Sequence, residues 1–289
     1  MTPRNALLAI HLGALMFGLS GVLGKLADST PLIITFGRAF FAVLALLLVA
    51  RLLPASGARP DWRQRCGLAF GGLLLGAHWL TFFVAVKIAG VGIATLGFAS
   101  FPAFTVLLEG LLFRERTRVV EFAMVALVCT GLLLVTPQFD LASGPTAGLL
   151  YGVLSGLLFA LLSLLNRAVT RGLDPVRAAL WQNLAILVGL LPFSWAAVPA
   201  VPAQDWLWLA LLGVLCTGLA HSLFVASLRV LKARTTSVIF ALEPVYGIAF
   251  AWWLFDEQPT LRMLLGGTLI IVASIVTSRL KSAPTNPAT

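Results

Sequence analysis

Two stretches of this chain, 142 positions apart, carry the same landmarks inside long apolar segments. The first, PAFTVLLEGLLFRE, runs from Pro102 to Glu115, and the second, PVYGIAFAWWLFDE, runs from Pro244 to Glu257. Three further pairs of like residues share the offset: Phe17 and Phe159, Lys25 and Arg167, and Lys87 and Arg229. A proline and a helix-end acid that recur in two halves indicate an internal structural repeat, and in membrane proteins such repeats most often build transporters.

The composition places the chain in a lipid bilayer. Hydrophobic residues make up 60% of the 289 residues and charged residues only 11%, whereas a soluble domain has roughly 45–50% apolar residues. Such a chain would aggregate in water. In lipid it can form a helix bundle, because each helix satisfies its own backbone hydrogen bonds. The sequence therefore predicts an all-α integral membrane protein.

Ten apolar segments have about the twenty residues that a spanning helix needs. They cover residues 6–27, 32–53, 66–86, 90–113, 119–136, 146–166, 176–198, 206–228, 235–255 and 260–279. Five spans per half make the second half start on the opposite side of the membrane. We therefore expect two inverted five-helix repeats, 1–140 and 141–281, with the substrate site at their interface near the midplane. The polar, proline-rich tail 282–289 is predicted to be disordered.

The basic residues predict the topology. With a cytoplasmic N-terminus, sixteen of the twenty fall on the cytoplasmic side, only Lys25, Lys87 and Arg262 fall outside, and Arg38 lies within a span. This is the positive-inside bias, and it predicts that both termini are cytoplasmic, in a bacterial inner (plasma) membrane. The formal charge of +9 is then explained by topology and contact with anionic lipid. The short loops offer no basic patch large enough for nucleic acid.

Several other classes of protein lack support in the sequence. The first apolar run is too long for a signal-peptide h-region and continues as a span. Cys66, Cys129 and Cys216 have no metal-ligand spacing and are expected to be small packing residues, so neither a metal nor a cofactor is predicted. An intramembrane enzyme remains an alternative, but no catalytic or nucleotide-binding motif is present. A channel would need a filter segment, and none is visible. The oligomeric state is left open, and a monomer is compatible with the sequence.

The chain resembles a known family in several of these features. Ten helices, the pair Phe17-Gly18 followed by Lys25, and the paired proline–glutamate signatures are similar to the drug/metabolite transporter superfamily, in its EamA-type branch. The resemblance covers residues 6–280, and its most specific part is ALEPVYGIAFAWWLFDEQPT at 241–260. The first half departs from the family in reading FGLS where a WGS-like run is common, so a role for an indole ring there is in doubt.

The resemblance implies a function. Within the superfamily, the Phe/Trp-rich middle looks most like the bacterial amino-acid exporters of the YddG type. It implies a secondary transporter that exports amino acids, preferably apolar or aromatic ones, by alternating access. The alternative is a proton-coupled exporter of hydrophobic drugs or cationic metabolites. Membrane lipid and a small-molecule substrate are the expected partners.

Aromatic and polar side chains near the span centres are the candidates for a substrate cavity. Phenylalanines would supply an apolar wall, and hydroxyls, imidazoles and one buried acid would supply polar contacts. The expected lining residues are Phe17, Ser20, His78, Trp79, Phe82, Phe98, Phe101, Phe159, Ser163, His221 and Glu243. Pro102 and Pro244 are expected to kink their helices at mid-length, either as packing features or as hinges in alternating access.

Two interpretations remain open for each buried charge or imidazole. Glu243 is either a proton-coupling or ammonium-binding group, or a structural acid bonded to groups that Pro244 frees. Arg38 either snorkels to the interface or binds a carboxylate or a gate partner. His78 and His221, one position off the repeat register, are either bonded within the bundle or line the cavity.

The remaining acids are expected to be structural. Glu109 should form an interfacial ion pair with the nearby Arg114. Glu115 and Glu257 are predicted to cap the helices that follow them.

Overall fold

The computed structural model describes residues 2–54, 57–112, 119–136, 140, 143–228, 230–231 and 239–280. Glu115, Arg114 and the tail 282–289 lie outside these ranges, as does the start of the predicted ninth span. The helices are α1 (Pro3–Leu26), α2 (Pro31–Leu52), α3 (Trp62–Phe98), α4 (Phe101–Leu112), α5 (Val119–Val135), α6 (Gly144–Val169), α7 (Pro175–Ser194), η1 (Val198–Ala200), α8 (Ala203–Gly213), η2 (Val214–Leu219), α9 (Ala220–Leu228), α11 (Glu243–Phe255) and α12 (Leu261–Leu280).

These helices account for ten spans in the described parts of the chain. Gly90, with φ 83° and ψ 170°, divides α3 into the third span and the first part of the fourth, and α4 completes the fourth. The helices α8, η2 and α9 together form the eighth span. Six segments are each long and apolar enough to cross a membrane unaided. The third and fourth spans are joined at Gly90 without a loop. Glycine alone accepts the backbone conformation of this residue without strain.

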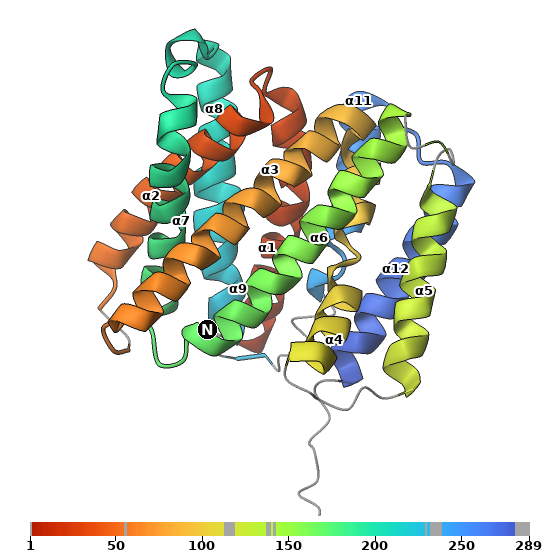
Figure 1. The fold of residues 1–289 in the computed structure, drawn as a ribbon, viewed down its shortest axis with the longest axis horizontal. Helices are drawn as coiled ribbons and strands as arrows, with labels where there is room; N and C mark the ends of the chain where they lie inside the picture. Colours follow the sequence, from red (N-terminus) through yellow and green to blue (C-terminus); the bar gives the residue numbers. More distant parts are fainter. Residues whose placement is uncertain are drawn as a thin grey trace, which may run out of the picture.

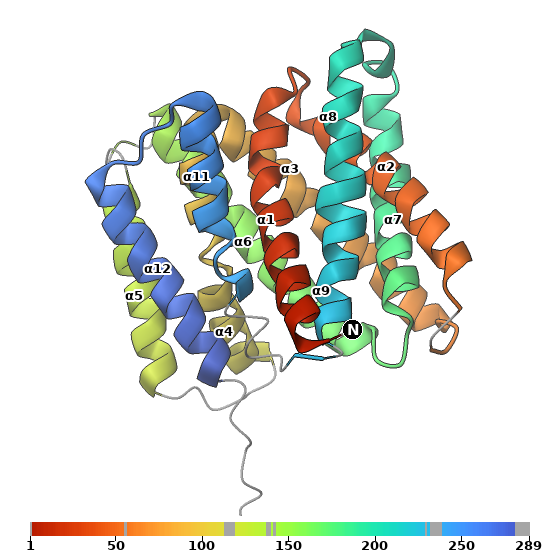
Figure 2. The ribbon, with the colours of Figure 1, turned by 180° about the vertical axis from the view of Figure 1, so that it is seen from behind.

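The two halves are inverted relative to each other and are intertwined. In Figure 1, α1 begins at the lower edge beside the N-terminus, whereas α6 begins at the upper edge and descends. The first helix of each half packs into the other half: α1 against α9 and α11, and α6 against both parts of α3. Other pairs, among them α2 with α7 and α5 with α12, also join the halves. Figure 2 shows the N-terminus and the end of α12 at the same face.

Glycines set the closeness of these contacts. A Cβ atom at Gly152 of α6 would lie 2.9 Å from the Ala94 carbonyl oxygen of α3, and one at Gly156 would lie 2.9 Å from that of Phe98. On α1, a Cβ at Gly18 would lie 3.0 Å from the Glu243 carbonyl oxygen. Small residues bring helix backbones together in lipid, where association depends on van der Waals packing. The first helix of each half is thereby held tightly against the interrupted span of the other.

Both interrupted spans break just before their prolines. Residues 99–100 form a turn between α3 and α4, and residues 241–242 form a turn before α11. Pro102 and Pro244 each lie in the first turn of a new helix, where the missing N–H would have no intrahelical partner in any case. The prediction that these prolines kink continuous helices is therefore wrong. They begin the second half of a broken span.

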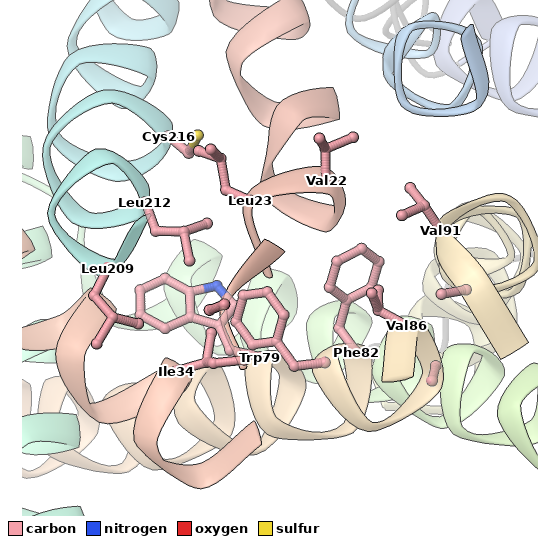
Figure 3. Close-up of a cluster of buried hydrophobic side chains, with 14 of the residues drawn as sticks. Val22, Leu23, Ile34, Trp79, Phe82, Val86, Val91, Leu209, Leu212 and Cys216 are labelled. Carbon is pink, nitrogen blue, oxygen red and sulfur yellow. The ribbon is translucent and has the colours of Figure 1, made fainter. Parts of the chain in front are cut away.

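A buried apolar cluster joins the two halves of the bundle. Figure 3 shows the side chains of α1, α2 and α3 meeting Leu209, Leu212 and Cys216 of the second half.

The three cysteines differ in burial. Cys216 is buried, as predicted for a packing residue, but Cys66 and Cys129 are exposed on the outer surface of the bundle. The prediction that they are packing residues is therefore wrong for Cys66 and Cys129.

Candidate functional site

One cavity of about 500 Å³ lies between the two halves. Every predicted site residue lines it, and both prolines border it: Phe17, Ser20, His78, Trp79, Phe82, Phe98, Phe101, Phe159, Ser163, His221, Glu243, Pro102 and Pro244. The structure thus brings together residues from α1, α3, α4, α6, α9 and α11. That they bind substrate stays a prediction.

One wall of the cavity is aromatic. The rings of Phe98 and Phe101 are stacked with centroids 5.3 Å apart, and the Phe159 ring meets that of Phe98 edge-on at 5.4 Å. The His78 ring lies 5.1 Å from both Phe98 and Phe159. These are the offset and edge-to-face geometries that aromatic rings prefer. Because α3 and α4 belong to the first half and α6 to the second, this wall joins the two halves.

Arg38 is fully enclosed within the bundle. Its side chain is buried, with its Nε donating to Thr217 Oγ1 at 3.0 Å and its Nη2 donating to the Cys216 carbonyl oxygen at 3.4 Å. Its guanidinium lies 4.0 Å from the centre of the Trp79 ring, within range of a cation–π interaction. The snorkelling interpretation of Arg38 is therefore wrong, and its charge faces the cavity.

A π-helical turn, η2, presents the groups that hold Arg38. Within it the Thr217 hydroxyl donates to the Leu212 carbonyl oxygen, five residues back, at 3.1 Å. A π-helical turn accommodates an extra residue and is often found at functional sites. One extra residue here explains why His221 stands one position off the repeat register relative to His78. Both imidazoles line the cavity.

His78 has a defined tautomer. Its Nδ1 lies 2.7 Å from Ser155 Oγ and 3.2 Å from the Ser155 carbonyl oxygen, while the same hydroxyl donates to the His78 carbonyl oxygen at 3.0 Å. Because both groups facing Nδ1 act as acceptors, this network assigns the proton to Nδ1 and leaves Nε2 as an acceptor. The two interpretations of His78 both hold, since it is bonded within the bundle and lines the cavity.

Glu243 begins α11 at the break in the ninth span. It is half-buried, lines the cavity, and interacts electrostatically with Arg38. A helix N-terminus carries partial positive charge, which stabilises a carboxylate at this position. Within the described part of the chain the two charges do not form a direct ion pair. Both side chains line the cavity.

Sequence reasoning missed several lining residues. They are Thr217, Phe240, Asn166, Gln182 and Asn183, and Arg38 was considered without being placed in the site. The signal that could have found the last three is the presence of carboxamides inside the apolar sixth and seventh spans, since polar side chains within a membrane are costly and often functional.

The cavity extends toward the face that carries the N-terminus. Its lining includes Asn166, three residues before the end of α6, and Ala179, four residues after the start of α7. At the opposite face, Glu257 pairs with Lys25 and accepts from the backbone N–H groups of Val91 at 3.0 Å and Gly92 at 3.4 Å. Glu257 therefore caps the helix that follows Gly90 in the other half, which corrects the prediction that it caps the helix after it.

Further contacts close the same face. Asp205 at the start of α8 accepts from the backbone N–H groups of Asp28 at 3.1 Å and Ser29 at 2.7 Å, and the Lys87 ammonium donates to the Ala27 carbonyl oxygen. They tie the α1–α2 connection to α3 and to the second half.

Glu109 forms its ion pair across the two halves. Arg167 Nη1 lies 3.1 Å from Glu109 Oε1, whereas the predicted partner Arg114 lies outside the described residues.

Within the described residues, no group of three or more His, Cys, Asp or Glu side chains is arranged to hold a metal ion.

Ten spans in two inverted halves around a central cavity define a membrane transporter. The model of the EamA-like transporter family matches residues 4–136 and 146–279. The chain therefore belongs to the EamA-like transporter family, and the alternative of an intramembrane enzyme is set aside.

Curated relatives agree with this assignment. An uncharacterised transporter of Archaeoglobus fulgidus is 28% identical over 94% of this chain and 95% of its own length. One of Helicobacter pylori is 25% identical over 94% and 95%, and the uncharacterised transporter YxxF of Bacillus subtilis is 23% identical over 71% and 67%. None of these three names states a substrate or the YddG type. A solved structure, described only as a crystal structure of a protein, covers 97% of this chain and 98% of its own with a TM-score of 0.63 at 18% identity, a likeness of fold alone.

Proposed function

We propose that this transporter exports amino acids, preferably apolar or aromatic ones, across a bacterial inner membrane by alternating access, as the YddG-type exporters do. The observation that supports the proposal is that two side chains of opposite charge type, Arg38 and Glu243, line one cavity that also has an aromatic wall. A zwitterion presents a carboxylate and an ammonium group on the same carbon, with an apolar side chain beside them. The cavity offers a partner for each of these three parts.

The chemistry of recognition follows from the geometry of the two charges. The guanidinium of Arg38 is held from one side by Thr217 and Cys216, and its other N–H groups can bind a carboxylate. Glu243 can accept from the α-ammonium group. Because charge-assisted hydrogen bonds contribute about 1.5–3 kcal/mol each, these two contacts would dominate binding. The phenylalanine wall adds non-directional contact that allows several side chains.

Alternating access would exchange the two ends of the cavity. In this structure the end opposite the termini is sealed, and the cavity extends toward the face with the termini. We infer that the termini are cytoplasmic and that this state loads substrate from the cytoplasm. Single cysteines at Ser143 and Gln204, in a variant without native cysteines, should react with an impermeant thiol reagent in intact cells, and one at Arg59 should not. Labelling at Arg59 alone would overturn this topology.

Counterflow in proteoliposomes tests the proposed substrate class. Vesicles preloaded with unlabelled phenylalanine should accumulate labelled phenylalanine, tryptophan and leucine, and empty vesicles should not. Labelled cationic dyes serve as the comparison. Counterflow of dyes without counterflow of any amino acid would contradict the proposal.

The second candidate is a proton-coupled exporter of hydrophobic drugs or cationic metabolites. It is favoured by the half-buried Glu243, which faces Arg38, His78 and His221 across the cavity. If Glu243 couples protons, Glu243→Gln should remove the pH dependence of transport and leave counterflow largely intact. If Glu243 binds the ammonium group, counterflow itself should fall by about tenfold or more at every pH, in line with the loss of a hydrogen bond to a charged group.

A further inference from the structure

We propose that three carboxamides, Asn166, Gln182 and Asn183, form a second polar subsite of the cavity. It would select amino acids whose side chains end in a neutral hydrogen-bonding group. This inference deepens the proposed export of amino acids and rests on it. The three residues line the same cavity as Arg38 and Glu243, but they stand apart from those charges toward the face with the termini.

The carboxamides are held in defined orientations. Gln182 Nε2 donates to Asn166 Oδ1 at 2.7 Å, which joins α7 to α6. Asn183 Nδ2 donates to the Ala179 carbonyl oxygen at 2.9 Å, and this bond fixes which end of the amide is the acceptor. Gly71 of α3 makes room for the cluster, because a Cβ atom there would lie 2.7 Å from Gln182 Nε2. The neighbouring helix is thus shaped around the Gln182 side chain.

One acceptor in this cluster has no partner. Asn183 is 2% exposed, and its Oδ1 atom has no hydrogen bond within the described residues. A buried polar group without a partner is unfavourable in a protein interior. Because Asn183 lines the cavity, a donor on a bound ligand is the partner that we propose for this oxygen.

The fold does not require carboxamides at these places. By the 142-residue offset Asn166 of α6 corresponds to Gly24 of α1. Counted from the prolines that begin α2 and α7, Gln182 and Asn183 correspond to Arg38 and Ala39. The first half builds the same helices without a carboxamide at any of these three places. Polar side chains inside a membrane are costly and generally serve a pathway or a binding site. Both halves share the same scaffold, but only the second half has the carboxamide cluster. The cluster therefore serves substrate recognition, since folding of the scaffold does not need it.

The positions of two contacts along α3 give the distance between the Arg38 guanidinium and the carboxamide subsite. Gly71 contacts the Gln182 amide, and Trp79, eight residues later, lies beneath the Arg38 guanidinium. At 1.5 Å per residue the two groups are roughly 12 Å apart along the helix. On α6, Asn166 follows Phe159 by seven residues, which places the carboxamides roughly 10 Å from the aromatic wall along that helix.

A ligand of matching length can reach both ends. From the carboxylate carbon to the terminal nitrogen of glutamine there are five bonds, or roughly 6–7 Å in extended form. A hydrogen bond of about 2.9 Å at each end brings the total near the roughly 12 Å that the helix rise gives. Tryptophan, with its indole N–H, has a comparable reach, whereas leucine is shorter and has no donor. Because the subsite is neutral, it offers no countercharge to acidic or basic side chains.

Selectivity between matched cargoes tests the subsite. In counterflow with purified protein in proteoliposomes, Asn183→Leu and Gln182→Met keep the side-chain volume and remove the amide. Each should weaken the apparent affinity for glutamine and tryptophan by about tenfold or more, and that for leucine by less than twofold. Ser222→Ala is the matched control, since Ser222 is not among the residues that line the cavity and its hydroxyl donates to the Gly218 carbonyl oxygen at 2.7 Å. An equal loss for all three cargoes, or no loss, would overturn the subsite.

A variant with an expected gain of transport for a new substrate distinguishes a change in selectivity from loss of activity through misfolding. Asn183→Asp places a negative charge at the subsite and should shift preference toward lysine or arginine relative to glutamine by about tenfold. An unchanged preference in a folded Asn183→Asp protein would also count against the subsite. Wild-type counterflow separates the two hypotheses. No flux with any amino acid refutes the proposed export, whereas amino-acid flux with unchanged selectivity in these variants refutes the subsite alone.

Discussion

The two interrupted spans have the same architecture but different chemistry. In the first half the turn at residues 99–100 leads to Phe101 and Pro102, and in the second the turn at 241–242 leads to Glu243 and Pro244. All four of these residues line the same cavity. The proline and the break recur because both halves need the same helix geometry. The acid occurs once, where the first half has a phenylalanine ring.

The second spans show the same division. Counted from the prolines that begin the two helices, Pro31 and Pro175, Arg38 on α2 corresponds to Gln182 on α7. Arg38 lines the cavity and is held by the π-helical turn η2, which has no equivalent in the described part of α3. What the halves share therefore builds the scaffold. What they do not share places charge at selected points of the cavity, and the expected effects of substitution follow from that distinction.

The largest expected effect is at Arg38, where the halves differ in charge. Arg38→Leu should lower amino-acid counterflow by about 100-fold, because charge-assisted contacts to the carboxylate are lost. Leu180→Met is the control and should leave counterflow within twofold. Arg38→Lys should retain part of the activity, because a lysine keeps the charge but not the planar arrangement of donors. Full counterflow in a folded Arg38→Leu protein would contradict a carboxylate-binding role.

A smaller effect is expected where the halves carry the same residue. Phe17 and Phe159 correspond in the repeat and both line the cavity. Phe17→Ala and Phe159→Ala should each remove one aromatic contact worth about 1–3 kcal/mol, which is roughly a fivefold to 150-fold loss of apparent affinity for aromatic cargo. Resistance of cells to a panel of toxic amino-acid analogues measures the change in selectivity. If one variant keeps the wild-type profile, that ring packs against the scaffold and the two halves do not share the wall equally.

Much of the fold could be predicted from the sequence, because it depends on properties of whole segments. Span length, total hydrophobicity and the bias of basic residues predict ten helices in two inverted halves without knowledge of any contact. The candidate residues were brought together because aromatic and polar side chains at mid-span depth have the cavity as a shared neighbour. Repeat register then linked positions such as Phe17 and Phe159.

What the sequence could not predict depends on contacts between distant segments. Lys87 marks the junction between the third and fourth spans in the sequence, but the absence of a loop there depends on the backbone conformation of the single residue Gly90. Glu257 caps a helix in the other half, and its partner groups are backbone N–H atoms that leave no pattern in the side chains. The helices are apolar on nearly all sides, so periodicity does not tell which face of α7 meets the cavity, and Gln182 and Asn183 were missed for this reason.

The two ends of the cavity allow a second comparison between ion pairs. Glu257 pairs with Lys25 at the sealed end, and Glu109 pairs with Arg167 at the other. Glu257→Gln should weaken the seal by about 1 kcal/mol, since the pair is partly exposed and the cap partly survives. A cysteine at Ser20 should then react about fivefold faster with an impermeant reagent added from the sealed side. Glu109→Gln should leave that rate unchanged or lower it, and an equal rise in both variants would indicate general loosening.

The smallest effect is expected at the prolines, where the halves agree in sequence and in structure. Each proline lies in the first turn of its helix, so replacement by alanine breaks no backbone hydrogen bond. It mainly gives the unfolded chain more freedom, at a cost in stability of about 0.4–1 kcal/mol. If the breaks act as hinges, Pro102→Ala and Pro244→Ala should also slow counterflow by a factor of about two to five at unchanged apparent affinity, because an added N–H lets each new helix extend back across its turn. Similar slowing in both variants would mean that both breaks move during transport. Slowing in one variant alone would mean that only one half moves against a fixed partner. Full rates in both, with the expected loss of stability, would leave the prolines as packing features that the repeat duplicated.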